Sequence, residues 1–189
     1  RLDVSPVRLA MHLAMALFIL ALELWTALGA FGWPSQRSQV GVWRWGPLAL
    51  MALIFAQVML GALLAGSGGG IAYADWPTIG GEWIPSSVFG LEDFWSNFTA
   101  EHATQHLLHR STGYVVALFS LMLSLAGLIR GQGEARWALG LVGLVALMQA
   151  ALGIMTVLAV SPLSLSLLHQ AGAAVLWMTT LVAARAAWR

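Results

Sequence analysis

Apolar residues along the chain gather into five long runs, separated by segments that hold most of the charged and polar residues. Each run has the length of about 20 residues that an α-helix needs to cross the hydrocarbon core of a bilayer. Prolines lie at or just before several of the expected helix starts, where a missing N–H does no harm. The pattern predicts an all-α integral membrane protein with five transmembrane helices, at residues 9–30, 47–66, 107–129, 136–159 and 164–185.

Composition supports a membrane protein and excludes several other classes. Of the 189 residues, 59% are hydrophobic and only 9% are charged, with a mean hydropathy of +0.80. The formal net charge is +1, and the basic residues are nine scattered arginines, which leave no basic face for a nucleic acid. Because the chain has no cysteine, disulfides, thiolate metal sites and iron–sulfur clusters are excluded. A metal ion would need histidine or carboxylate ligands.

The charges of the connecting segments predict how the helices are oriented. The linker 31–46, the turn 130–136 and the C-terminal tail carry an excess of arginine, which the positive-inside rule places in the cytoplasm. The segment 67–106 carries five acidic residues and no arginine, so we expect it to be an outer loop. Its glycine run, tryptophans and prolines predict an ordered lid at the membrane interface. We therefore expect a multi-pass protein of the cell inner (plasma) membrane, with the first, third and fifth helices starting at the outer face.

Each of these three helices carries a histidine near its outer start, namely His12, His109 and His169. A metal-ligating side chain at membrane depth is costly to place and indicates a functional site. Two histidines on different helices at comparable depth can supply both axial ligands of a heme, and we predict this role for His109 and His169. Arg110 is placed to pair with a heme propionate. The alternative is that both histidines are satisfied by water or backbone groups.

Three further ionisable residues are candidates for function. His102 and His106 precede His109 on one stripe of the same helix, so the three can bind zinc or copper. We expect instead that His102 and His106 lie on an exposed approach to the helix, solvated or in contact with the outer loop. Glu23 lies well inside the first helix, as part of a proton path or as a protonated or water-linked group.

Two short repeats predict how the chain is divided. The second and fourth helices share Gln-x-x-x-Gly at residues 57–61 and 149–153, where glycine allows close helix packing. The first and fifth helices share an early histidine after Ser-Pro, so the last four helices form one four-helix bundle and helix one belongs to a preceding, similar half. The expected parts are the last helix of a truncated N-terminal half at 1–30, a cytoplasmic linker at 31–46 and a heme-binding bundle at 47–189 with the outer loop 67–106. We also expect the chain to begin inside a longer protein.

At these motifs the chain resembles the heme A synthase family, the membrane enzymes that convert heme O to heme A for terminal oxidases. The similarity runs in order over almost the whole chain, from the family's fourth helix onward. The glycine run of the outer loop departs from the family pattern, in which an acidic residue often stands there. The matching pieces are residues 4–13, 57–61, 72–77 with 80–85, 109–110, 149–153 and 168–172.

The resemblance implies a cofactor, a reaction and roles for the site residues. His109 and His169 would ligate the iron of a heme b, with Arg110 in the same cofactor site. His12 would be catalytic, at the iron of the substrate heme O. The implied oxidoreductase oxidises a methyl group of heme O to a formyl group in heme biosynthesis and cytochrome oxidase assembly. This chain would retain the heme b half and be catalytically incomplete by itself.

The resemblance also implies the partners heme O, membrane lipid, heme O synthase and an electron donor, and it leaves a homo-oligomer open. Two other functions stay open at this point. One is a membrane cytochrome b that only transfers electrons. The other is a transporter or structural bundle without a cofactor, in which Glu23 and the histidines form a proton path.

Overall fold

The computed structural model describes residues 5–34 and 44–188, and most of the predicted linker 31–46 lies outside them. Five of the helices are long and apolar enough to cross a membrane, as the hydrophobic pattern predicted. Together with two short helices they give an all-α multi-pass architecture over the described residues. The elements are α1 (Pro6–Ala30), α2 (Gly46–Gly66), η2 (Gly69–Ile71), α3 (Ser96–Thr99), α4 (His102–Arg130), α5 (Gly133–Leu158) and α6 (Leu163–Trp188).

Helix α4 begins at His102, five residues before the apolar run predicted it (107 − 102). Its N-cap is Glu101, whose carboxylate accepts a hydrogen bond from the backbone N–H of Thr104. The first turns carry polar side chains because they pack beneath the outer loop rather than against lipid. Residues 102–106, which the sequence suggested were the end of that loop, are therefore helical.

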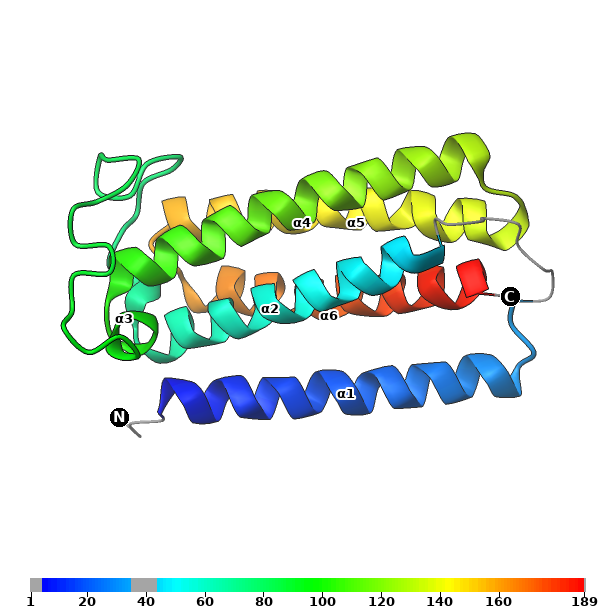
Figure 1. Cartoon of the computed structure of the whole chain (residues 1–189), viewed down its shortest axis with the longest axis horizontal. Helices are drawn as coiled ribbons and strands as arrows, with labels where there is room; N and C mark the ends of the chain where they lie inside the picture. Colours follow the sequence, from blue (N-terminus) through cyan, green and yellow to red (C-terminus); the bar gives the residue numbers. More distant parts are fainter. Residues whose placement is uncertain (1–4, 35–43, 189) are drawn as a thin grey trace.

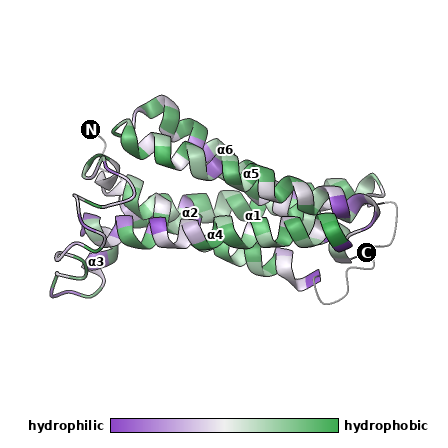
Figure 2. Ribbon diagram, turned by 90° about the horizontal axis from the view of Figure 1, so that it is seen from above, coloured by the Kyte–Doolittle hydropathy of each residue, from purple (hydrophilic) through white to green (hydrophobic). Residues whose placement is uncertain are grey.

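The long helices run up and down, so that α1, α4 and α6 all start at the end of the molecule that carries residues 67–101 (Figure 1). We call this the loop end. Helix α4 packs against α2 and α5, α6 packs against the same two helices, and α1 lies along α2 and α6 at the edge of the bundle. Green hydrophobic ribbon dominates the helices, and the purple hydrophilic residues gather mainly toward their ends (Figure 2). This is the arrangement expected of a membrane-spanning helical bundle.

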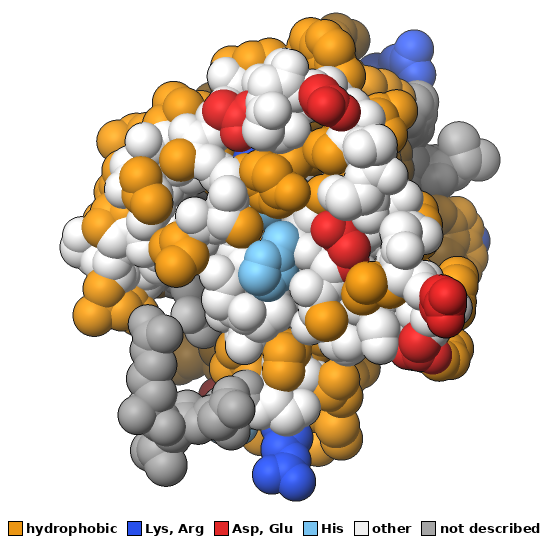
Figure 3. Space-filling model, turned by 90° about the vertical axis from the view of Figure 1, so that its left-hand side faces the viewer, with side chains coloured by type: hydrophobic (Ala, Val, Ile, Leu, Met, Phe, Trp, Pro, Cys, Tyr) orange, Lys and Arg blue, Asp and Glu red, His pale blue; other side chains and the backbone are white. Residues whose placement is uncertain are grey.

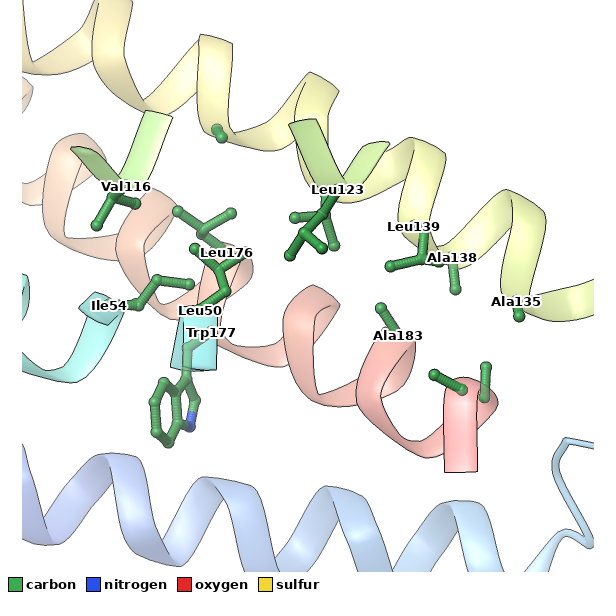
Figure 4. Close-up of a cluster of buried hydrophobic side chains, with 14 of the residues drawn as sticks. Leu50, Ile54, Val116, Leu123, Ala135, Ala138, Leu139, Leu176, Trp177 and Ala183 are labelled. Carbon is green, nitrogen blue, oxygen red and sulfur yellow. The ribbon is translucent and has the colours of Figure 1, made fainter. Parts of the chain in front are cut away.

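The core lies between the four helices α2, α4, α5 and α6 (Figure 4). Leu50 and Ile54 of α2 meet Leu123 of α4 and Leu176 of α6 there, and all four side chains are buried. Small residues bring the backbones of α4 and α5 close together, because a Cβ on Gly143 would lie within 3 Å of the Ser124 side chain. Large apolar side chains such as Met11, Leu22 and Leu147 face outward, as lipid contact requires.

Helix α1 is fixed to the bundle by hydrogen bonds from α6. The indole N–H of Trp177 donates to the carbonyl of Leu17 over 3.1 Å, and Arg185 Nη1 donates to the carbonyl of Trp25 over 3.2 Å. Figure 4 shows the Trp177 indole pointing from α6 toward α1. The opposite face of α1 is exposed and carries His12 and Glu23. The assignment of α1 to a preceding half stays a prediction.

Candidate functional site

His109 of α4 and His169 of α6 lie side by side inside the bundle, near the loop end. Their imidazole ring centroids are 6.4 Å apart, and the ring planes are nearly perpendicular, at 86°. A metal ion bound about 2 Å from one nitrogen of each ring would place the two centroids roughly 6 Å apart. The separation therefore fits a single metal ion held from both sides by the two imidazoles.

A glycine backs each of these rings from the neighbouring helix. A Cβ built on Gly61 of α2 would lie 2.9 Å from Cε1 of His109, and a Cβ on Gly153 of α5 would lie 2.9 Å from Cε1 of His169. Real Cβ atoms do not approach other atoms so closely, so any larger residue would displace the ring. The helix pairs α2–α4 and α5–α6 thus build the same arrangement twice.

One turn before each glycine stands a glutamine, and the two glutamines are used differently. The side-chain nitrogen of Gln57 lies 3.4 Å from Nε2 of His109, whereas that of Gln149 donates to the backbone carbonyl of His169 over 2.7 Å. Glycines on the partner helices make room for both amides, Gly113 for Gln57 and Gly172 for Gln149. The glycines of the four helices thus leave space for the two rings and the two amides.

Four polar atoms at this place are buried without a hydrogen-bond partner among the described residues. They are Nδ1 of His109, Nδ1 of His169 and the amide oxygens of Gln57 and Gln149. Buried polar atoms in folded proteins nearly always have partners, so four unpartnered ones together indicate a place for another group. Two facing imidazoles with free nitrogens, glycine-backed and enclosed by apolar helices, fit a heme iron with two axial histidines.

His106 and Arg110 form a second polar cluster, between α4 and the outer loop. His106 is completely buried, and its Nε2 lies 2.9 Å from the carbonyl oxygen of Gly69. Arg110 is 9% exposed; it donates to Nδ1 of His106 over 3.1 Å, to the carbonyl of Asp75 over 3.0 Å and to the carbonyl of Thr78. The expectation of loop contact at His106 is thus confirmed, but its expected exposure is wrong, because the loop folds over this turn of α4.

Arg110 therefore donates two of its five N–H groups to the loop and a third to His106. Only its Nε is buried without a partner among the described residues. The predicted pairing with a propionate stays a prediction, for which the N–H of Nε is one available donor. A zinc or copper site built on His102, His106 and His109 has no support, because the described residues contain no group of three or more histidine, aspartate or glutamate side chains that could hold a metal ion.

Asp75 organises the part of the loop that Arg110 contacts. Its carboxylate accepts hydrogen bonds from the N–H groups of Gly80 and Gly81, both over 2.9 Å, and from the hydroxyl of Thr78 over 2.7 Å. Burial acts to raise the pKa of Asp75, but these hydrogen bonds outweigh it and lower the pKa to about 2. Both glycines have positive φ, at 64° and 85°, a conformation that glycine adopts without strain. The turn is thus held around an ionised carboxylate.

The remaining candidates lie apart from the pair of rings. His12 and Glu23 are exposed on α1, and His102 is partly exposed at the start of α4. Carboxylates are spread over the surface of the loop end, with an imidazole among them (Figure 3). Sequence reasoning missed the contact between Gln57 and the His109 ring and the contacts of His106. The signal for the first was the repeated Gln-x-x-x-Gly; for the second the sequence offered none.

Comparison with known proteins decides the family. A family model described as cytochrome oxidase assembly protein matches residues 1–181. The chain belongs to this family. Heme A synthases are among its relatives in the comparison: the protein of Caulobacter vibrioides is 37% identical over 193 residues, and that of Maricaulis maris is 41% identical over 196 residues, each alignment covering 100% of this chain. The heme A synthase of Paracoccus denitrificans is 38% identical over 92% of this chain.

The chain spans about half the length of these curated relatives, with 54%, 55% and 47% of each covered. No solved structure matches it significantly. The resemblance inferred from the motifs is confirmed as membership of this cytochrome oxidase assembly family.

Proposed function

We propose that this chain is the part of a heme A synthase that binds a heme b between His109 and His169. The observation that carries the proposal is the ring separation of 6.4 Å, with a buried, unpartnered nitrogen on each ring. The relatives named heme A synthase support a role in heme A biosynthesis. A bound heme with two histidine ligands would supply one-electron transfer chemistry.

The residues of the chain then have distinct tasks. His109 and His169 orient their imidazoles toward a shared position, and Gly61 and Gly153 let neighbouring helices support the rings closely. The apolar helices exclude water from this position. Arg110 places a positive charge beside His109, and its unpartnered Nε suits an anionic group such as a propionate.

The proposed reaction of the full-length enzyme is oxidation of a methyl group of heme O to a formyl group. This change replaces two hydrogens of the methyl group with one oxygen atom. With water as the source of that oxygen, it releases four protons and four electrons, and the electrons pass to an external acceptor. We assign His12, exposed on α1, to the iron of the substrate heme. The loop end carries carboxylates, and the opposite end of the bundle carries Arg130, Arg136 and Arg185. This distribution of charge supports an inner-membrane orientation with the histidine layer toward the outer face.

The test uses cells that make heme O but lack their own heme A synthase. Expression of the full-length protein should produce heme A, detected by chromatography of extracted hemes, and His109→Ala or His12→Ala should abolish it. A protein that binds heme but yields no heme A would be an electron-transfer cytochrome b instead. A purified protein that stays colourless after heme supplementation would favour a bundle without a cofactor.

A further inference from the structure

We propose that Arg44, held against the rings of Trp45 and Trp188, binds the phosphate of an anionic phospholipid at the end of the bundle opposite the loop end. The start of α2 and the end of α6 lie at that end (Figure 1). Trp188 is about 28 Å along α6 from His169, so the proposal does not depend on the bound heme.

Both the backbone and the side chain of Arg44 are held by tryptophan. The indole N–H of Trp188 donates to the carbonyl of Arg44 over 2.9 Å, and the rings of Trp45 and Trp188 meet edge to face, with centroids 4.5 Å apart. The guanidinium carbon of Arg44 lies 5.0 Å from the centroid of the Trp188 ring and 5.6 Å from that of Trp45. Both distances are within the roughly 6 Å over which an aromatic face attracts a cation. The guanidinium is therefore restrained before any ligand binds, and little side-chain entropy is lost on binding.

The hydrogen-bond donors of Arg44 are left for a ligand. Its side chain is exposed, and none of the residues that the structure describes accepts a hydrogen bond from its guanidinium. A guanidinium carries five N–H groups in one plane, and two of them match two oxygens of a phosphate. Arg185 at the same end differs, because its Nε donates to the carbonyl of Trp33 and its Nη1 to that of Trp25. Arg185 is thus used in the packing of the protein itself.

The depth of Arg44 in the bilayer favours a phospholipid over a soluble anion. Helix α2 has 21 residues, so it is about 32 Å long, close to the thickness of the hydrocarbon core. Arg44 lies just before the first residue of α2 and therefore falls in the headgroup layer, where the lipid phosphates are. Tryptophan is enriched in this layer, and Trp45 and Trp188 are both exposed there.

The charge of this end favours an anionic lipid. Arg130, Arg136 and Arg185 lie at the same end, and Glu134 is the one carboxylate there among the described residues. Such an excess of arginine attracts anionic headgroups. Phosphatidylglycerol fits this site because its headgroup has a phosphate and no cation, whereas phosphatidylcholine balances its phosphate with an ammonium group.

The experiment measures the affinity of the full-length protein for phosphatidylglycerol in a neutral detergent, by native mass spectrometry during a lipid titration. The wild-type protein should bind phosphatidylglycerol severalfold more tightly than phosphatidylcholine. Arg44→Gln should weaken this binding severalfold, and so should Arg44→Lys, which keeps the charge but loses the planar fork. Arg136→Gln and Arg136→Lys are the matched controls and should change it little, because Arg136 stacks on one ring only, that of Trp137 at 5.9 Å.

Weaker binding in both Arg44 variants, with little change in the Arg136 variants, supports the proposal. Equal losses at the two positions would show that charge alone attracts the lipid and would overturn it. An Arg44→Lys protein that binds like the wild type, or a wild-type protein that binds both lipids equally, would also overturn it. Inorganic phosphate that displaces the lipid at equal concentration would reject a lipid site in favour of a soluble anion.

The heme content of each variant, read from the absorption spectrum, separates this proposal from the proposed function. It should equal that of the wild type in all four variants, since the site lies far from His169. If the Arg44→Gln protein does not accumulate, the Arg44→Lys protein decides by the same comparison with Arg136→Lys. A wild-type protein that binds no heme would reject the proposed function and leave the lipid titration as the test of this site.

Discussion

Arg110 donates a hydrogen bond to Nδ1 of His106, one turn earlier on α4, over 3.1 Å. A guanidinium has only donors, so Nδ1 must be an acceptor and the ring is neutral, with its proton on Nε2. That proton is donated to the carbonyl oxygen of Gly69, 2.9 Å away. A single imidazole therefore joins the start of the loop to the residue beside the proposed iron ligand.

Replacing this imidazole should weaken the loop end. In a His106→Leu protein the carbonyl of Gly69 loses its donor and Arg110 loses an acceptor, and each buried unsatisfied group costs about 1–3 kcal/mol. We expect a lower melting temperature in detergent and faster amide hydrogen exchange in residues 67–78. The partly exposed His102 provides the control, since His102→Leu should change both quantities little. Equal effects of the two substitutions would contradict the assigned role of His106.

The Asp75 turn should open as the pH falls. The pKa of Asp75 is lowered from 3.8 to about 2 in the folded protein, because its hydrogen bonds outweigh the opposing effect of burial. A lowered folded-state pKa stabilises the turn above the unfolded pKa, and this stabilisation is lost as the pH falls through the folded one. Exchange of the Gly80 and Gly81 amides, corrected for intrinsic rates, should accelerate between about pH 4 and pH 2.

Asp75→Asn tests the cause of that pH dependence. The amide side chain carries no titrating group, so exchange at Gly80 and Gly81 should be fast at neutral pH and should no longer respond to acid through Asp75. The same acid response in the wild-type and Asp75→Asn proteins would show that another group controls the turn.

Alanine at the ring-backing glycines should disturb heme binding while the helices stay folded. The new Cβ of Gly61→Ala or Gly153→Ala would lie 2.9 Å from a histidine ring, so the ring or the helix must move. We expect the heme content per protein to fall severalfold, measured from the absorption spectrum. Gly140→Ala is the matched control: its Cβ would also meet an atom at 2.9 Å, but that atom is the flexible end of Leu128, about 20 Å along α5 from Gly153. Normal heme content in all three proteins would contradict the proposal that Gly61 and Gly153 pack directly against the heme-binding histidine rings.

Much of the fold could be predicted from hydrophobic pattern alone, because crossing a bilayer requires about 20 apolar residues in each helix. The five spans and the common starting end of α1, α4 and α6 follow from it. The side-by-side position of His109 and His169 could also be predicted, since equal depth on different helices brings side chains into one layer. The separation and angle of their rings could not, because they depend on the packing of Gly61 and Gly153.

The loop network lay beyond sequence reasoning for a different reason. His106 and Arg110 are polar, and polarity at a helix start ordinarily indicates exposure. Here the backbone carbonyls of Gly69, Asp75 and Thr78 cover them, and no sequence pattern shows where a carbonyl will point. The use of Gln57 on a ring and of Gln149 on a backbone carbonyl likewise depends on three-dimensional contacts, because the two local motifs are alike.

The most direct test of the account is the electron paramagnetic resonance spectrum of the ferric, heme-loaded full-length protein. Two axial imidazoles with nearly perpendicular planes, as the angle of 86° indicates, should give a strongly anisotropic low-spin signal. The account predicts that His109→Ala and His169→Ala each eliminate this signal in favour of high-spin iron. A low-spin signal that persists unchanged in both variants would contradict it.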